Sequence, residues 1–464
     1  MAVAESGFDL AIRGGTVVTS DAMFQADIGI RSGRIAQIGG DVQAEDEFDA
    51  SGKLVLPGGV DAHVHLSLPD PPGGDPHWCD DFVSGTRAAA AGGITTVGNM
   101  TFPYPGQTLR DAVGRDATAV ERDAIVDVVL HPVLTDPTTQ PLDDIPELAA
   151  RGHTTLKVFM SFGGFASAPA VYLEAMRLAA AAGMLTMVHA EDAAMIAHAT
   201  ARLMAEGRGA IANYARSRPA AAEVSATARA VAFAELTGAP IYLVHLSCAG
   251  ALAEARRGRE REARIAVETR PLYLHLTEER FAEPDGGKYV GQPPLRTPAD
   301  VEALWRGLAN GEIDTVGSDH APWRYADKVG SDLDVSTARP GVADLDTMLP
   351  MLFSEGVVKG RISIHRFVAV AATNAAGLLG VFPRKGTIAV GADADLVVWD
   401  PALTKPVRAA ECQTNADYSP YEGWEVTGWP VATVSRGEVV FQEDKVTGAR
   451  GRGHILRRGS TPPT

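Results

Sequence analysis

The 464-residue sequence predicts a (β/α)8 barrel of the TIM type, an α/β fold, with a small β-sandwich domain built from both termini. Short apolar runs alternate with longer helix-like stretches through the middle of the chain, which is typical of parallel βα units. Both ends of the chain instead carry short β-branched runs separated by turn residues. We therefore expect a barrel over residues 57–381 and a composite sandwich over residues 1–56 plus 382–464.

The segment over residues 8–56 alternates β-branched runs with turn residues, as antiparallel strands with tight turns do. Residues 385–401 and 431–442 have the same character near the other end of the chain. Two β segments at opposite ends of a sequence can pair into one small domain. The middle of the chain would then be an insertion between them.

The middle of the chain contains eight strand candidates. They are residues 59–66, 94–100, 125–132, 154–160, 185–190, 241–247, 264–269 and 313–319. This number matches a (β/α)8 barrel with insertions better than an open doubly wound sheet. The carboxyl ends of barrel strands face one mouth, which is where barrel active sites are built.

Metal-competent side chains lie in or just after five of these runs: His63, His65, Lys157, His189, His245 and Asp319. Side chains alternate along a strand with period two, so His63 and His65 face the same side and can bind one ion. A single buried histidine is usually structural, whereas four histidines and an aspartate at one barrel mouth indicate a functional site. Neutral imidazoles with carboxylate-type oxygens suit zinc, with manganese, cobalt and iron as alternatives.

Lys157 lies inside the apolar run LKVFM, where an uncompensated ammonium would be costly. One interpretation is a lysine that reaches solvent or forms an ion pair. The other is that its amine reacts with carbon dioxide. The resulting carbamate is an anionic oxygen donor that can bridge two metal ions.

Charge and cysteine content restrict the partners and the compartment. The chain has 42 basic and 58 acidic residues, a net charge of −16, which disfavours nonspecific binding to nucleic acid or anionic membranes. The three cysteines lie far apart in no CxxC arrangement, and the first residues do not read as a signal peptide. The longest weakly polar run, residues 178–188, is shorter than the ~18 residues of a spanning helix. We expect a cytoplasmic protein with no membrane or nucleic-acid partner.

Several longer motifs occur along the chain in a recognisable order. They are VDAHVHL, GGITTV, LKVFM, VHAED, SATARAVAFAELTGAPIYLVHLSC, YVGQPPLR, VGSDHAP and PRKGTIAVGADADLVVWDP. In this order they closely resemble the cyclic amidohydrolases of the hydantoinase and dihydropyrimidinase group, in the amidohydrolase superfamily. The resemblance covers nearly the whole chain. It implies a barrel with a composite β-sandwich, a binuclear metal centre and a homotetramer.

The resemblance also implies a division of the metal ligands. One ion would be held by His63, His65 and Asp319, the other by His189 and His245, and carboxylated Lys157 would bridge the two. Asp319 would take the proton of the bridging water and pass it to the leaving nitrogen. The neighbouring His320 would be a supporting residue rather than a catalyst.

The sequence departs from the family pattern at substrate-facing positions. The tyrosine that the family places two residues after the methionine of KVFM, an oxyanion donor, is Phe162 here. The serine before the double proline is Gln292, and the ETCP motif reads ETRP, with Arg270 at the third position. The Asn-Gly stretch before a proline is replaced by residues 336–340. A chain that keeps its metal ligands but drops this donor has been retuned for another acyl group.

We expect the substrate to contact Phe159, Phe162, Gln292 and Thr337. Phe159, Phe162 and Phe165 form an aromatic-rich loop, which is interpreted as a hydrophobic substrate wall rather than as plain packing. The family residue at position 292 binds the ring imide through its backbone, so Gln292 would keep this contact although its side chain differs.

Three functions are compatible with these residues. The first is hydrolysis of a C–N bond in a cyclic amide or imide, with room for an apolar substituent. The second is hydrolysis of an open-chain amide, urea, carbamate or thiocarbamate, which Phe162 favours. The third is a noncatalytic scaffold related to dihydropyrimidinases, which the complete set of metal positions disfavours.

Overall fold

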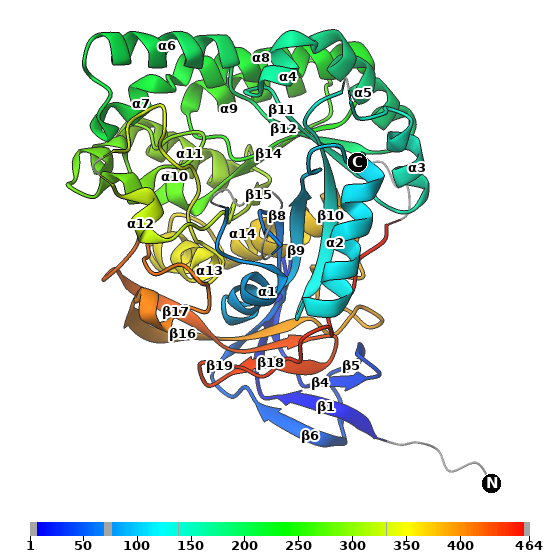
Figure 1. Cartoon of the computed structure of the whole chain (residues 1–464). Coiled ribbons are helices and arrows are strands. Elements are labelled where there is room, and N and C mark those ends of the chain that lie inside the picture. Colours follow the sequence, from blue (N-terminus) through cyan, green and yellow to red (C-terminus); the bar gives the residue numbers. More distant parts are fainter. Residues whose placement is uncertain (1–6, 69–76, 138, 331, 459–464) are drawn as a thin grey trace.

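Eight parallel strands form a barrel at the centre of the molecule (Figure 1). The computed structural model describes residues 7–68, 77–137, 139–330 and 332–458. The barrel strands are β8 (Gly59–Val64), β9 (Ile94–Thr101), β10 (Asp127–Leu134), β11 (Thr155–Phe159), β12 (Leu185–His189), β13 (Ile241–Leu243), β14 (Ile265–Thr269) and β15 (Thr315–Val316). Each pairs in parallel with its neighbour in chain order, which confirms the predicted barrel.

The barrel closes where the chain after β15 meets β8. Val64 and His320 form a parallel bridge, and the His65 backbone N–H donates to the His320 carbonyl oxygen at 2.8 Å. The buried carboxylate of Asp61 accepts hydrogen bonds from the backbone N–H groups of His63 and Ser318. These contacts bring the two histidines of the HxH motif beside Asp319.

Helices surround the barrel on its outside (Figure 1). They are α1 (Phe82–Ala91), α2 (Leu109–Asp123), α3 (Asp144–Ala150), α4 (Gly163–Ser167), α5 (Pro169–Ala181), α6 (Ala193–Ala205), α7 (Tyr214–Ser217), α8 (Ala220–Thr237), α9 (Ala249–Glu260), α10 (Pro271–His275), α11 (Pro298–Asn310), α12 (Tyr325–Lys328), α13 (Met348–Leu352), α14 (Ile364–Val368) and α15 (Asn374–Leu378). Three of these helices begin at a residue whose side chain accepts a hydrogen bond from a backbone N–H of the first turn: Asp81 for α1, Thr108 for α2 and Thr297 for α11. None of the described helices is long and apolar enough to cross a membrane.

Two sheets lie below the barrel in Figure 1 and are built from the terminal segments. The N-terminal strands are β1 (Phe8–Arg13), β2 (Thr16–Val18), β3 (Met23–Gln25), β4 (Ile28–Arg31), β5 (Arg34–Ile38), β6 (Ala44–Asp49) and β7 (Leu54–Pro57). The C-terminal strands are β16 (Leu396–Pro406), β17 (Glu425–Ser435), β18 (Glu438–Gln442) and β19 (Lys445–Val446). Antiparallel pairing of β7 with β16 joins both ends of the chain in one seven-stranded sheet, as the sequence predicted.

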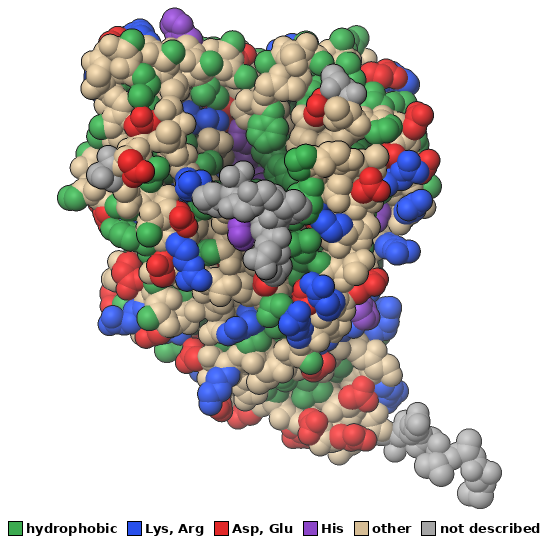
Figure 2. Space-filling view, in the orientation of Figure 1, with side chains coloured by type: hydrophobic (Ala, Val, Ile, Leu, Met, Phe, Trp, Pro, Cys, Tyr) green, Lys and Arg blue, Asp and Glu red, His purple; other side chains and the backbone are tan. Residues whose placement is uncertain are grey.

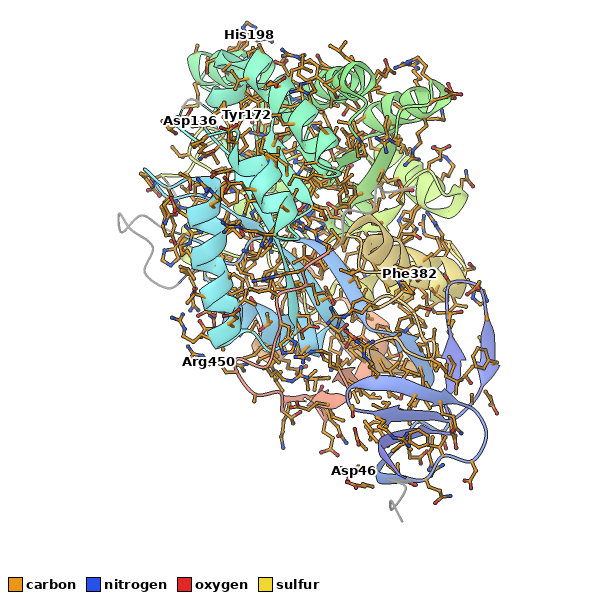
Figure 3. All side chains as sticks on the ribbon, turned by 90° about the vertical axis from the view of Figure 1, so that its right-hand side faces the viewer. Asp46, Asp136, Tyr172, His198, Phe382 and Arg450 are labelled. Carbon is orange, nitrogen blue, oxygen red and sulfur yellow. The ribbon has the colours of Figure 1, made fainter. Side chains whose placement is uncertain are left out.

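The terminal sheets and helix α6 lie at opposite ends of the molecule, marked by Asp46 and His198 in Figure 3. After β19 the chain returns to the barrel. The Leu456 N–H donates to Val128 at the start of β10, and the Arg458 N–H donates to Gly152 before β11. The predicted domain boundaries, which assign this tail to the sandwich, stay a prediction.

Candidate active site

The HxH motif and Asp319 form a compact group of buried ligand atoms. His63 Nε2 lies 3.3 Å from Asp319 Oδ1, and His65 Nε2 lies 3.0 Å from the same oxygen. The ligand atoms of the three residues all lie within 4.8 Å of one another. His63 in β8 and His65 just after it therefore face one carboxylate, as the HxH spacing predicts.

A second pair of histidines lies against the first group. His189 ends β12 and His245 follows β13, and His189 Nδ1 lies 3.0 Å from His245 Nε2. The ring of His245 stacks on that of His63 with centroids 5.3 Å apart. Side chains from four strands thus meet at one mouth of the barrel.

Lys157 on β11 is fully buried beside both groups. Its Nζ lies 3.4 Å from His63 Nε2 and 4.7 Å from the centre of the Phe159 ring. Burial lowers the pKa of Lys157 from 10.5 to about 7, although Asp319 and Glu268 oppose this shift. Near neutral pH its amine is therefore available in the uncharged, nucleophilic form.

Carboxylates behind the cluster orient two of the four histidines. His63 Nδ1 contacts Glu268 Oε1 at 2.9 Å, and His189 Nε2 contacts Glu191 Oε2 at 2.8 Å. Burial lowers the pKa of all four histidines, so the rings are neutral and their other nitrogens can carry lone pairs toward the cluster. Neutral imidazoles held by carboxylates, with one aspartate and a buried amine, fit a site for divalent metal ions.

The supporting carboxylates were missed as functional residues in the sequence. Glu268 also accepts from the Tyr242 hydroxyl at 2.6 Å, and Glu191 is bound by the buried Arg218 guanidinium. Glu191 follows His189 by two residues, and this short spacing could have indicated that the two side chains lie close together. Glu268 lies more than two hundred positions from His63, so no local pattern connects the two.

Two of the cluster residues have strained backbones. His245 has φ of 44° and Asp319 has φ of 47°, both in the left-handed region that side chains other than glycine rarely adopt. Such conformations persist only where surrounding contacts enforce them, and they concentrate at functional sites. Here they turn a side chain inward just after β13 and β15.

Asp319 is held from both sides. Its Oδ1 faces the two histidines, and its Oδ2 accepts a hydrogen bond from Arg270 Nη1 at 2.8 Å. Burial opposes ionisation, but Arg270 and His63 keep the pKa of Asp319 well below its ordinary range. His320 lies outside the cluster, because its Nε2 contacts Asp80 Oδ2 and its Nδ1 accepts from the Asp344 N–H.

A pocket of about 200 Å³ opens onto the cluster. It is lined by His65, Trp78, Phe102, Phe159, Phe162, His189, His245, Gln292, Asp319, Ala321, Pro340 and Gly341. Figure 2 shows histidine side chains within a hollow bordered by hydrophobic ones. Three of the four residues predicted to contact substrate are among these lining residues.

In the aromatic loop after β11, two phenylalanines line the pocket and the third is packed away from it. Phe159 and Phe162 stack in parallel 4.5 Å apart and face the pocket. Phe165 is buried against Tyr172 instead and does not line the pocket. Thr337 lies in an exposed turn bound to Asp334, whereas the later residues Pro340 and Gly341 reach the pocket. A substrate contact of Thr337 stays a prediction.

A second pocket of about 250 Å³ adjoins the first and shares Trp78 and Phe102 with it. Its walls are largely apolar: Leu66, Leu68, Met100, Tyr104 and Trp323 contribute, together with the ion pair of Arg115 and Asp116. An apolar substituent on a substrate at the cluster could extend into this space.

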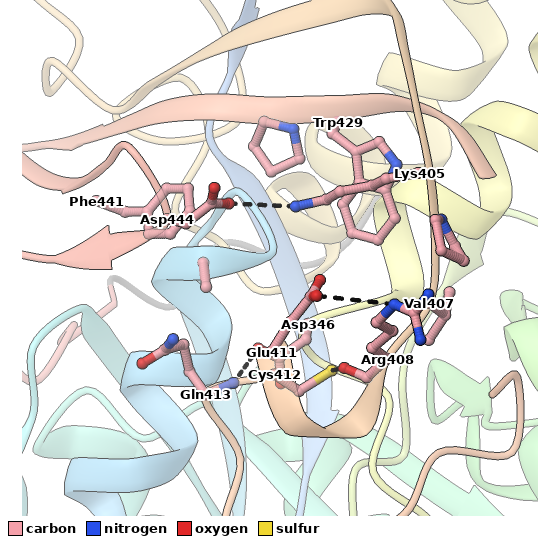
Figure 4. Close-up of a pocket in the computed structure, with 13 residues that line it drawn as sticks. Asp346, Lys405, Val407, Arg408, Glu411, Cys412, Gln413, Trp429, Phe441 and Asp444 are labelled. Atoms are coloured by element: carbon pink, nitrogen blue, oxygen red, sulfur yellow. Dashed lines mark hydrogen bonds and ion pairs between the residues drawn. The ribbon is translucent and has the colours of Figure 1, made fainter. Parts of the chain in front are cut away.

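Another pocket lies between the barrel and the seven-stranded sheet (Figure 4). Its Lys405 pairs with Asp444 at 3.2 Å and covers the Trp429 ring, and Asp346 accepts from the Gln413 N–H. None of the candidate metal ligands lines it. The chemistry therefore belongs to the barrel mouth.

Comparison with known proteins agrees with this geometry. The sequence profile described as the amidohydrolase family matches residues 54–440. The chain is 39% identical over 456 residues to a D-hydantoinase of Ralstonia pickettii, covering 97% of this chain and 99% of that one. It is 38% identical over 453 residues to a D-phenylhydantoinase of Escherichia coli O1:K1, covering 96% and 97%.

A solved dihydropyrimidinase from Brevibacillus agri superposes with a TM-score of 0.90 at 35% identity, covering 97% of this chain and 98% of that one. The likeness therefore extends through the barrel and the terminal sheets together. Sequence profile, full-length identity and superposed structure all lead to one assignment. The chain belongs to the amidohydrolase family.

Proposed function

We propose that this protein is a metal-dependent hydrolase that opens a C–N bond in a cyclic amide or imide of the hydantoin or dihydropyrimidine type. The observation that carries the proposal is the meeting of His63, His65, Lys157, His189, His245 and Asp319 under one pocket. Full-length relatives with hydantoinase and dihydropyrimidinase names support the same substrate class.

Two divalent ions, zinc in the first instance, would be held by these residues. His63, His65 and Asp319 would bind one, His189 and His245 the other, and Lys157 would bridge them as a carbamate. When bound, the ions would activate water and polarise the substrate carbonyl as Lewis acids. Manganese, cobalt and iron suit the same donor set.

Carboxylation of Lys157 requires an uncharged amine, which burial favours. The Nζ lone pair forms a bond to the carbon of carbon dioxide, one C–O π bond breaks, and the amine loses a proton. The uncharged amine becomes an anion with two donor oxygens, so the site gains a negative charge beside four histidines, and the released proton passes to solvent water. No oxidant or other reactant is consumed.

Asp319 would carry the proton. Its Oδ1 faces His63 and His65, while Arg270 holds Oδ2, so one oxygen is directed to the reacting centre. The carboxylate would accept the proton of the attacking water and deliver it to the ring nitrogen as the C–N bond breaks. The water oxygen forms the new C–O bond, so the opened product carries a new carboxylate and a ureido or amide group.

Phe162 shapes the substrate preference. The pocket has an aromatic face at this position and lacks the hydroxyl of the family pattern. We infer a preference for rings that carry an apolar substituent, which Phe159, Phe162 and the neighbouring pocket would cover. An open-chain carbamate is the alternative substrate that this loss of a donor favours.

The test is a substrate panel with metal-reconstituted enzyme: hydantoin, phenylhydantoin, dihydrouracil, allantoin, a linear urea and a linear carbamate. We expect ring opening of phenylhydantoin to be fastest. Hydrolysis of the linear compounds alone would overturn the cyclic assignment, and hydrolysis of none would overturn the function.

We also propose that the protein forms a homotetramer, because it resembles this family. We propose a cytoplasmic location because its three cysteines are all free. Light scattering coupled to size-exclusion chromatography tests the first of these predictions.

A further inference from the structure

Arg270 is a buried cation directly behind the candidate metal site. Its guanidinium is fully buried, Nη1 donates to Asp319 Oδ2 at 2.8 Å, and Nη2 lies 3.5 Å from the Asp319 carbonyl oxygen. Within the described chain, Asp319 is the only residue that accepts a side-chain hydrogen bond from Arg270, and Nε has no partner. Asp319 is the anion that binds this buried cation directly, and the carboxyl of Asp344 also helps to raise the pKa of Arg270.

The contact makes the two carboxylate oxygens of Asp319 inequivalent. Oδ2 is bound to Arg270, whereas Oδ1 lies 3.0 Å from His65 Nε2 and 3.3 Å from His63 Nε2. A planar guanidinium fixes the orientation of a carboxylate more firmly than an ammonium on a flexible stem. Only Oδ1 therefore remains free to face the cluster.

Arg270 acts through Asp319 and not on the substrate. It does not line the pocket that opens onto the cluster. It lies beneath the chain at Gly291, where an added Cβ would come within 3.2 Å of Nη1, and its Cζ lies 5.5 Å from the centre of the Tyr273 ring. The glycine lets the pocket-lining segment with Gln292 pass over the guanidinium.

We propose that Arg270 is a positioning residue that locks Asp319 so that Oδ1 alone serves as metal ligand and proton carrier. The inference rests on the proposed metal-dependent function and extends it to a residue at which this chain departs from the family motif. Two effects compete: the lock favours metal binding, and the added positive charge opposes it. The direct 2.8 Å contact, which binds Oδ2 and leaves Oδ1 facing the two histidines, indicates that the lock dominates.

Removing the lock should therefore weaken metal binding. Chelator-treated wild type, R270M and R270K are titrated with Zn²⁺ against a chromophoric chelator, a measurement that needs no substrate. We expect R270M to bind one of its ions about 10–100-fold more weakly, with a comparable fall in kcat and little change in KM. R270K, which keeps the charge but not the planar fork, should lie between R270M and wild type.

The matched control is R458M, which removes another buried guanidinium. Arg458 contacts the Leu379 carbonyl and the Thr155 hydroxyl, and in the described chain it makes no hydrogen bond to a candidate metal ligand. Its loss should lower thermal stability and leave Zn²⁺ affinity unchanged. Melting curves with chelator present establish which variants fold, and R270K carries the test if R270M does not.

Zn²⁺ binding by R270M and R270K that equals or exceeds that of wild type would overturn the proposal. Tighter binding would show that Arg270 acts by charge alone. A wild type that binds Zn²⁺ but opens no ring of the panel would contradict the substrate assignment and leave the Arg270 result standing. A wild type that binds no ion would contradict the metal-dependent function and this inference with it.

Discussion

Lys157 is the residue whose environment departs most from its ordinary chemistry. A fully buried amine with a pKa near 7, within 3.4 Å of a candidate ligand, is placed to become a bridging carbamate. Lys157→Ala should abolish hydrolysis and remove at least one ion, because the bridge gives one oxygen to each. Metal analysis and assay of the purified variant check this. A variant with normal metal content and normal rate would show that no carbamate bridge exists.

Phe162 offers a gain-of-function test. If its ring replaces an oxyanion donor, Phe162→Tyr should raise turnover of hydantoin and dihydrouracil, by up to ~10²-fold. Phe165→Tyr is the control, because Phe165 is buried against Tyr172 and does not line the pocket. The measurement is kcat/KM for dihydrouracil, phenylhydantoin and a linear carbamate. A wild type as fast on dihydrouracil as on the other two would show that Phe162 marks no change of substrate.

At this scale the sequence predicts candidate ligands better than the residues that support them. The six candidate positions are recognisable because histidine, lysine and aspartate lie in or just after apolar runs, and the fold brings them together. The sequence marks Arg270 only as a departure from a motif, since its pairing with Asp319 depends on β14 and β15 being neighbours. Thr337 is a predicted substrate contact that the structure does not bring to the pocket. It lies in an exposed turn, three residues before Pro340, which does line the pocket.

Among the elements, the loops at the barrel mouth line the two pockets in which we expect substrate specificity to be determined. Phe102 follows β9, and the centroid of its ring lies 5.7 Å from those of Trp78 and Phe159. It lines both the pocket at the cluster and the apolar pocket beside it. Phe102→Ala should lower kcat/KM for phenylhydantoin about tenfold and change that for hydantoin much less, because only the former fills the second pocket. Equal losses on both substrates would place the phenyl group elsewhere.

Element order and strand type were predictable, and exact ends were not. Alternation of apolar runs marked all eight barrel strands, yet β13 and β15 are shorter than their apolar runs. His245 and Asp319 lie just past these strands in left-handed conformations, so regular pairing stops before them. Regular strand geometry therefore stops just before two candidate ligands, and no local propensity marks these positions.

For the whole molecule, the terminal segments hold the barrel from outside. The last described residues return to the barrel through backbone hydrogen bonds. Leu456 donates to Val128 of β10, while Gly453 and Arg458 donate to the segments just before β10 and β11. Ending the chain at Arg452 should reduce the free energy of unfolding by at least about 2 kcal/mol, since several buried hydrogen bonds are lost. Denaturant melts compare the two chains. An unchanged midpoint would show that the tail is dispensable.

The pairing of the two termini was predictable from their shared β character, although the partners β7 and β16 lie more than three hundred residues apart. The contact of residues 453–458 with the barrel was not predictable, because the sequence after β19 has no regular alternation of apolar and polar residues. Long-range pairing of this kind is determined by the assembled surface rather than by local sequence.

The central claim is that a binuclear metal centre at the barrel mouth performs the hydrolysis, and one measurement tests it most directly. Protein purified without chelator is analysed for transition metals, and ring opening of phenylhydantoin is followed before and after chelation and after metal is restored. We predict about two ions per chain, loss of activity on chelation and recovery on adding zinc, manganese or cobalt. Absence of transition metal together with full activity in a strong chelator would contradict the account.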